Sequence, residues 1–525
     1  MNISSAATKI TDFKTGSEII ARVPLSNPAA AIHELDRILD SLLSSPPDEQ
    51  TFFRLLEEIR RPVATVAEDL SKRYVDMPVP LGDVEDAVFR QVAALWLKTA
   101  RAYARCAEKS PPGSGFSQDN HFATLLHRCI YFIGMGIIEY QRARQEVPWG
   151  LWLDLHGHYG TVEELGLTTL AVPHVLERTG QTHCAAAYFS FILCDMAGNY
   201  SLAQRDQILV RRWASAWSSM VSSYPAVAGE NLPPFVIDLM QDVAICPASD
   251  SLRTDQIRCL DTSSLSDHIY KLRSKLRKGT PPSQLALGED CTLQQCSRLL
   301  RYLVRHWSQA RAARKFRRHA ISGVVQICTG FEEIHYFISG KVFEQPEIMR
   351  IYSRRDFERL FAFGESSQTM QSQKYNLDTW EVVNQSANGF RLIRSVSGRK
   401  MIHGQLLALR PRDSERFFLG QVSWLMQERK GGLITGIRAL PGLPQAISAR
   451  LIDPAPSDQF ERVFLLPALA VAGAGTGAEQ SLVLPTGWYR SGRLVELYTD
   501  SLRRVCLKNV IDSGPDFQCI SFEDC

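Results

Sequence analysis

The chain has 525 residues and a formal net charge of +3, with 45% hydrophobic and 22% charged residues. This length exceeds one ordinary domain and predicts two to four, and the composition is typical of a soluble globular protein. The small net charge argues against a protein that binds polyanions over its whole surface, although it is compatible with a local basic patch.

The sequence carries no recognisable targeting or membrane segment. Residues 1–18 lack a basic region followed by an apolar core, and the most apolar late run, 463–473, is shorter than the roughly 18–20 residues that span a bilayer. We therefore expect a cytoplasmic protein. The 12 cysteines are scattered, and Cys291 and Cys296 lack the second pair or the histidines of a zinc site. We interpret the cysteines as small buried hydrophobic residues rather than as disulfides.

The first half of the chain predicts an N-terminal all-α helical array. Residues 1–24 are polar and weakly periodic, which indicates a loose strand or arm. From Pro28 onward, apolar residues recur at spacings of three and four, as on one face of a helix. No strict 34-residue repeat is present, so the array is irregular. The expected helical segments are 28–43, 52–59, 63–70, 88–106, 120–144, 149–165, 172–179, 184–196 and 201–224.

The predicted secondary structure changes twice in the middle of the chain. A possible strand at 235–239 interrupts the helices, and a further helix is expected at 261–278, followed by a linker and a connecting helix over 279–310. Residues 311–319 are the most basic stretch of the chain, and 321–328 read as a strand. A solvated helix end is the simplest structural explanation of such a basic stretch.

The second half is β-rich. Residues 380–393 predict a hairpin with a polar turn, because β-branched and aromatic residues flank Asn, Ser and Gly. Further strands at regular spacing predict a small antiparallel barrel, and a second small β unit follows from residue 456. The expected barrel strands are 321–328, 405–409, 417–426, 433–437 and 446–452, and those of the second unit are 463–471, 481–484, 493–498, 503–507 and 517–522.

Two motifs in this region resemble the signature of PilZ domains. Arg314 and Arg318 precede a strand with the spacing Arg-x-x-x-Arg, and Asn384, Ser386 and Gly389 form Asn-x-Ser-x-x-Gly between two strands. The resemblance covers residues 311–455 and implies a six-stranded barrel, with an insertion at about 329–375, that binds cyclic di-GMP, a bacterial second messenger. It implies no cofactor.

Recognition of this ligand suits the residue types. A guanidinium forks onto phosphate oxygens and bonds or stacks on guanine, while a glycine lets a nucleotide approach the backbone. The candidate ligand residues are Arg314, Arg317, Arg318, Asn384, Ser386 and Gly389. A rival arginine set lies in the insertion at Arg350, Arg354, Arg355 and Arg359. We prefer Arg314 and Arg318 because a better strand follows them directly.

Catalysis has no support in the sequence. His156 and His158 are two residues apart, which does not place them on one helix face, and they lack a third ligand in register. No phosphate-binding or nucleophile motif is present, and the glycine-rich run at 472–477 lies among expected strands. We therefore expect a binding protein and not an enzyme.

The predicted protein is a multidomain α+β signalling receptor. Residues 25–278 would form the helical output domain, which contacts a protein partner, 311–455 the barrel that senses cyclic di-GMP, and 456–525 the C-terminal β unit. A degenerate PilZ scaffold that only mediates protein contacts is the alternative. A nucleic-acid binder using 311–319 and 271–278 is a second rival, but the low net charge and the lack of interleaved aromatic residues argue against it.

Overall fold

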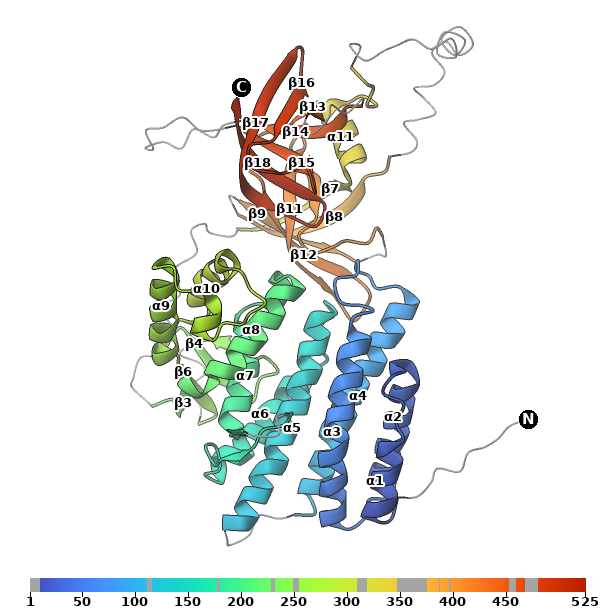
Figure 1. Cartoon of the computed structure of the whole chain (residues 1–525), viewed down its shortest axis with the longest axis vertical. Helices are drawn as coiled ribbons and strands as arrows, with labels where there is room; N and C mark the ends of the chain where they lie inside the picture. Colours follow the sequence, from blue (N-terminus) through green and yellow to red (C-terminus); the bar gives the residue numbers. More distant parts are fainter. Residues whose placement is uncertain are drawn as a thin grey trace, which may run out of the picture. The chain divides into compact units, whose positions relative to one another are not determined.

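The computed structural model of the chain describes residues 10–110, 116–176, 180–227, 232–248, 255–308, 319–346, 375–386, 388–395, 398–452, 459–467 and 480–525. It divides into two compact units. The first consists of Met1–Met77 and Leu81–Ala313, and the second of Pro78–Pro80 and Arg314–Cys525. Figure 1 shows helices in the first unit and strands in most of the second.

Helices that follow one another in sequence pack side by side in the first unit (Figure 1), notably α2 on α3, α3 on α4 and α4 on α5. Asn27 and Asp48 cap α2 and α3 by accepting hydrogen bonds from backbone N–H groups three residues on. The helices are α1 (Phe13–Ala21), α2 (Pro28–Ser44), α3 (Glu49–Ser71), α4 (Asp83–Ala107), α5 (Phe116–Arg142), α6 (Leu151–Glu164), α7 (Cys184–Met196), α8 (Gln204–Trp217), α9 (Ser263–Arg277) and α10 (Leu293–Trp307), with short 3₁₀ turns η1 (Asn199–Ser201), η2 (Ser218–Met220) and η4 (Pro282–Leu285).

The first unit is not all-α, so that expectation is wrong. It contains an antiparallel sheet of four strands in the order β3-β6-β4-β5. These strands are two to five residues long, too short for a clear alternating pattern. They are β3 (Ser222–Pro225), β4 (Phe235–Asp238), β5 (Cys246–Pro247) and β6 (Ile257–Asp261).

Three local expectations in the first unit also need correction. Residues 13–21 are helix α1 rather than an arm. Val172–Pro173 is a short strand, β1, that pairs with β2 (Gln181–Thr182), because a residue before proline is pushed out of the helical region. The two segments expected on either side of Pro62 form one helix, α3, whose apolar face is buried throughout. Burial of that face outweighs the roughly 3 kcal/mol that an internal proline costs a helix.

One helix of the described part, within α5, is long and apolar enough to cross a membrane by length and composition. However, 89% of this segment is buried inside the unit. Gly134 of α5 lies so close to Phe191 of α7 that a Cβ atom would be 2.2 Å from the Phe191 ring. This close packing is that of a core helix.

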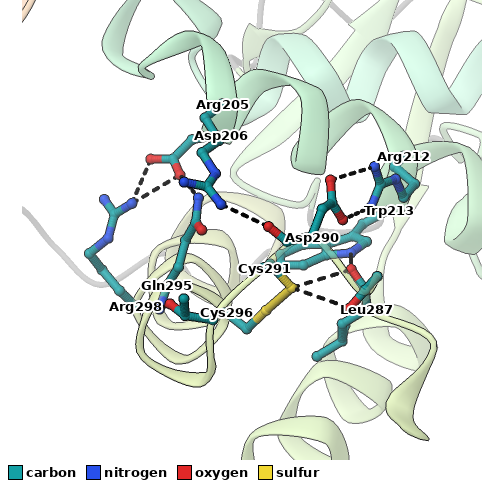
Figure 2. The surroundings of a disulfide bond; sticks show 12 residues. Arg205, Asp206, Arg212, Trp213, Leu287, Asp290, Cys291, Gln295, Cys296 and Arg298 are labelled. Atoms are coloured by element: carbon teal, nitrogen blue, oxygen red, sulfur yellow. Dashed lines mark hydrogen bonds and ion pairs between the residues drawn. A yellow bond between two sulfur atoms is a disulfide. The ribbon is translucent and has the colours of Figure 1, made fainter. Parts of the chain in front are cut away.

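Cys291 and Cys296 form a disulfide, so the expectation that no cysteines are bonded is wrong for this pair (Figure 2). Cys291 lies just before α10 and Cys296 lies near the start of this helix. Their Cα atoms are 6.4 Å apart, which is within the range that a disulfide spans. Asp290 beside them accepts two hydrogen bonds from Arg212, at 2.6 and 3.0 Å (Figure 2). Cys129, Cys184, Cys194 and Cys328 are free and buried, as expected.

The second unit contains two closed barrels, each of six antiparallel strands (Figure 1). The first barrel closes in the order β10-β11-β12-β9-β8-β7 and the second in the order β13-β14-β15-β18-β17-β16. The strands are β7 (His319–Thr329), β8 (Asp378–Ser386), β9 (Gly389–Arg394), β10 (Leu406–Pro411), β11 (Phe418–Gln427), β12 (Leu433–Ala439), β13 (Gln445–Leu451), β14 (Glu461–Leu466), β15 (Ser481–Pro485), β16 (Leu494–Tyr498), β17 (Leu502–Ser513) and β18 (Phe517–Asp524), and helix α11 (Phe331–Ser339) follows β7.

The strand at 446–452, expected to complete the first barrel, is β13 of the second. The first barrel closes without it, because β10 pairs with β7. The interior of the first barrel includes Trp380, Leu392 and Leu425, all buried. Val79 also belongs to this core, although it lies between α3 and α4 in sequence, and its backbone exchanges two hydrogen bonds of 2.8 Å with Met401.

Candidate functional site

The hairpin of β8 and β9 carries the Asn-x-Ser-x-x-Gly motif at its tip. The expected turn over 384–389 is shorter than predicted, because Asn384 and Ser386 belong to β8 and Gly389 begins β9. Ser386 pairs with Gly389 across the turn, and its hydroxyl donates hydrogen bonds to the Asn388 side chain (3.1 Å) and the Gly389 carbonyl (3.3 Å). The Asn388 carbonyl accepts a hydrogen bond of 3.0 Å from the Ala439 N–H at the end of β12. The tip is therefore fixed both internally and to the next strand.

Gly389 is required by the packing of the barrel. A Cβ atom on this residue would lie 2.4 Å from the carbonyl oxygen of Ile437 on β12. The contact is with backbone, which has little freedom to yield. The sequence suggested that a glycine here lets a ligand approach the backbone. The packing against β12 is a second reason for a glycine at this position.

A cavity of about 210 Å³ lies against this hairpin. Asn384, Ser386 and Gly389 all line it, so the structure brings these three predicted residues together at one site. Strands β9, β11 and β12 provide the rest of the wall. The other lining residues are Asn388, Phe390, Arg391, Ser423, Trp424, Gly436, Ile437 and Arg438.

Strand register arranges these residues in two neighbouring rows. In the first row, Asn384 pairs with Arg391, Arg391 with Gly436, and Gly436 with Trp424. The Trp424 indole lies over Gly436, where a Cβ atom would be 1.9 Å from the indole nitrogen. The indole thereby reaches across β12, and its ring is 5.8 Å from the Arg391 guanidinium carbon. A glycine in the middle of the row thus makes room for an aromatic side chain beside an arginine.

The second row runs one step along the same strands. Ser386 pairs with Gly389, Gly389 with Arg438, and Arg438 with Gln421. The Arg438 Nη2 donates a hydrogen bond of 2.5 Å to Gln421 Oε1 and pairs with Asp512 of β17. Side chains two residues apart on a strand share a face. The two arginines of the cavity wall therefore come from neighbouring strands and from neighbouring rows.

The wall is electropositive. Its described lining residues include two arginines and no carboxylate. The Arg391 Nε is buried and has no hydrogen-bond partner within the described part of the chain. A buried donor without a partner costs free energy unless a ligand or water satisfies it. The arrangement suits an anion, and the indole offers a flat face to a ring system.

Arg314, Arg317 and Arg318 lie outside the described residues, as do Arg350, Arg354, Arg355 and Arg359. The described part of the chain resumes at His319, which pairs with Gln385, while Ala320 pairs with Asn384. Strand β7 therefore begins beside the motif hairpin.

Sequence reasoning missed Arg391, Trp424 and Arg438. Arg391 and Trp424 lie on predicted strands and Arg438 one residue beyond one, but the pairing of β9 with β12 and of β12 with β11 was not predicted. The signal that could have found them is the alternation along each strand: Arg391 is two residues beyond Gly389, and Arg438 is two beyond Gly436. Alternation identifies which side chains share one face of a strand, but it does not identify the strands that pair with it.

His156 and His158, considered as metal ligands in the sequence, have different surroundings. His156 is buried, and its ring nitrogens interact with the Tyr188 hydroxyl (2.7 Å) and the Val243 carbonyl (2.9 Å). Because the carbonyl can only accept, Nε2 carries the proton. Burial lowers the pKa of both histidines. His156 therefore holds α6 to its surroundings as a neutral side chain, in keeping with a structural role.

A groove of about 1180 Å³ lies in the first unit, between α1, α2 and α4. Ile19, Ile38 and Ala104 contribute its apolar part, and four arginines alternate with four carboxylates around them. Several of these charges pair with one another, as Arg105 does with Glu108 at 2.6 Å. The groove has the size and mixed character of a surface that contacts other molecules.

Comparison with known proteins bears on the whole chain. Residues 14–226 match the model "Cyclic-di-GMP receptor FimW, N-terminal domain", 235–358 match "Cyclic-di-GMP receptor FimW, middle PilZ domain", and 447–525 match "FimW C-terminal beta-barrel domain". The cyclic-di-GMP receptor FimW of Pseudomonas aeruginosa is 22% identical over 505 residues, covering 86% of this chain and 81% of that protein. The three models are successive parts of one protein and together span most of the sequence. The chain therefore belongs to the family of PilZ-domain proteins with a large N-terminal helical region that these models describe.

Proposed function

We propose that this chain is a receptor for cyclic di-GMP and that the barrel of β7 to β12 is its PilZ domain. The observation that carries the proposal is the cavity at the motif hairpin, which combines Asn384 and Ser386 with Arg391 and Trp424 and has no described carboxylate. Two matches support the assignment: the PilZ model matches residues 235–358, which include β7 of this barrel, and the C-terminal β-barrel model matches 447–525, which lie in the second barrel.

The chemistry of the ligand fits this wall. Cyclic di-GMP presents two phosphodiester anions and two guanines. Arg391 would bond a phosphate oxygen or guanine O6 through its guanidinium, the Trp424 face would stack on a purine, and Asn384 and Ser386 would supply hydrogen bonds. A cavity of about 210 Å³ takes only part of such a ligand, since pockets that enclose drug-sized molecules measure about 300–1,000 Å³. Arg314, Arg317 and Arg318 would close on the remainder.

Recognition of this kind makes and breaks no covalent bond, so the protein would act as a receptor and not as an enzyme. We propose a cytoplasmic location for it. The helical unit would be the output part, with the groove between α1, α2 and α4 as the surface for a protein partner. A barrel that binds no nucleotide and only mediates protein contacts is the alternative. The cavity wall favours the receptor, because its described lining residues combine two arginines and a tryptophan with no carboxylate.

Calorimetric titration of the purified full chain with cyclic di-GMP tests the proposal. We expect saturable binding that weakens about 10-fold or more in Arg391→Ala, since a hydrogen bond to a charged group contributes about 1.5–3 kcal/mol. Arg503→Ala, which removes an arginine paired with Asp524 in the second barrel, is the matched control and should bind normally. Absence of binding by the unmodified chain would leave the scaffold alternative.

The same titration distinguishes the two arginine sets. If Arg314 and Arg318 close on the ligand, the double variant Arg314→Ala/Arg318→Ala loses binding and Arg350→Ala/Arg354→Ala keeps it. The reverse result would assign the role to the insertion. Cyclic di-AMP serves as a ligand control, because it has the same phosphodiesters without guanine O6.

A further inference from the structure

Arg438 in the cavity wall is held by the second barrel. Its Nη2 donates to Gln421 Oε1 (2.5 Å) and pairs with the carboxylate of Asp512, on β17. Its Nε and Nη1 carry no hydrogen bond among the described residues. A guanidinium fixed through one nitrogen keeps its other donors free for a ligand.

The turn between β17 and β18 is anchored beside this ion pair. Gln421 Nε2 donates a hydrogen bond of 3.0 Å to the Ser513 carbonyl, so Gln421 contacts Arg438 and the turn together. The Leu406 N–H at the start of β10 donates to Asp516 Oδ1 at 3.0 Å. A Cβ atom on Gly514 would be only 2.2 Å from the Gly404 carbonyl oxygen, so backbone meets backbone here. The second barrel therefore holds Asp512 at a defined place next to the cavity.

We propose that Asp512 is a positioning residue of the nucleotide site, supplied by the C-terminal barrel. The inference rests on the proposed function of that site. An arginine has several rotatable bonds, and a ligand that must order them loses affinity. Asp512 and Gln421 order the Arg438 side chain in advance, with free N–H groups at the cavity.

The charge of Asp512 by itself would weaken binding, because a carboxylate repels an anionic ligand. The side chains of Arg438 and Asp512 are 42% and 23% exposed, so water and salt screen this repulsion. Asp512 is also not among the residues that line the cavity. Positioning therefore outweighs repulsion, and removal of the carboxylate weakens binding.

Nucleotide binding in the cavity and the contact of Asp512 with Arg438 affect each other reciprocally. If the contact of Asp512 with Arg438 strengthens nucleotide binding, the nucleotide strengthens the contact between the barrels by the same factor. The C-terminal barrel would thus also respond to occupancy of the cavity, through the ion pair of Asp512 with Arg438.

The test is a double-mutant cycle on the full chain, with cyclic di-GMP titrated into the unmodified protein, Asp512→Asn, Arg438→Ala and the double variant. We expect Asp512→Asn to weaken binding about twofold to fivefold, as loss of a partly exposed ion pair does. In the Arg438→Ala background the same substitution should have no effect, because Asp512 acts only through Arg438. Asp524→Asn, which removes a carboxylate from the same barrel, is the control and should bind normally.

A conservative variant guards against a folding artefact. Asp512→Glu keeps the carboxylate and should recover part of the affinity that Asp512→Asn loses, while thermal unfolding shows that both variants are folded. Equal binding by Asp512→Asn and the unmodified chain would overturn this inference and leave the receptor proposal standing. Equal loss with and without Arg438 would also overturn it. Absence of binding by the unmodified chain would refute the proposed function and this inference together.

Discussion

Replacing Gly436 by alanine separates the function of the cavity from the stability of the barrel. The new methyl group would lie 1.9 Å from the Trp424 indole nitrogen, so the indole must leave its place over β12. The indole is a half-buried side chain on the outside of the barrel, and it can rotate away while the backbone stays. We therefore expect the free energy of unfolding to change by no more than about 1 kcal/mol.

The loss of binding should be much larger. Stacking of a base on an aromatic side chain contributes about 1–3 kcal/mol, which corresponds to about 5-fold to 150-fold in affinity. Gly436→Ala should reduce the affinity for cyclic di-GMP by a factor in this range, and Trp424→Ala by a similar factor. The two changes should not add, because both remove the same stack.

Calorimetric titration and urea unfolding of the same samples measure both quantities. Gly323→Ala on β7 is the matched control, since its methyl group would have no described atom within 4 Å. If Gly436→Ala binds as tightly as the unmodified chain while Arg391→Ala does not, the indole has no part in recognition. If Gly436→Ala unfolds the barrel, the assumption that Trp424 is free to move is wrong.

Three further predictions concern stability. Glu57→Gln should lower the free energy of unfolding of the first unit by about 3 kcal/mol in urea, because it leaves the fully buried Arg128 without its carboxylate partner. Burial lowers the pKa of His335 to about 4, so the folded state stays neutral while the unfolded state binds a proton near pH 6.5. Stability should therefore fall by about 2 kcal/mol between pH 6.5 and 4, and His335→Phe should flatten this dependence. Reduction of the disulfide of Cys291 and Cys296 should lower the unfolding free energy by at most about 2 kcal/mol, because the closed loop is short.

The sequence was sufficient to predict most strands and helices of the chain, because apolar residues alternate along strands and recur every three to four residues along helices. The β8–β9 hairpin is an example, because residues that favour turns separate two runs of β-branched and aromatic residues. The motif residues Asn384, Ser386 and Gly389 were singled out by their resemblance to the PilZ signature, and the local pattern placed them at this hairpin. Local physics dominates at such positions.

The arrangement of strands in space was not predictable in the same way. Trp424 contacts Arg391 only because β12 lies between their strands with Gly436 in register, and a shift by one residue would put these side chains on opposite faces. Likewise, β13 was expected in the first barrel, because no local sequence pattern indicates that β10 pairs with β7 and closes the barrel. Both facts depend on pairs of residues far apart in sequence, which one sequence does not display.

The position of Val79 affects how this chain can be divided. The polypeptide passes between the two units three times, after Met77, after Pro80 and after Ala313. A protease that cuts near residue 313 would leave Val79 on the N-terminal piece and Met401 on the other, with both of their backbone hydrogen bonds intact. The two pieces should therefore stay associated after cleavage. A barrel fragment expressed from residue 314 would instead lack the bridge partner of Met401 and a core side chain that is 1% exposed. A short peptide containing Val79 would replace both.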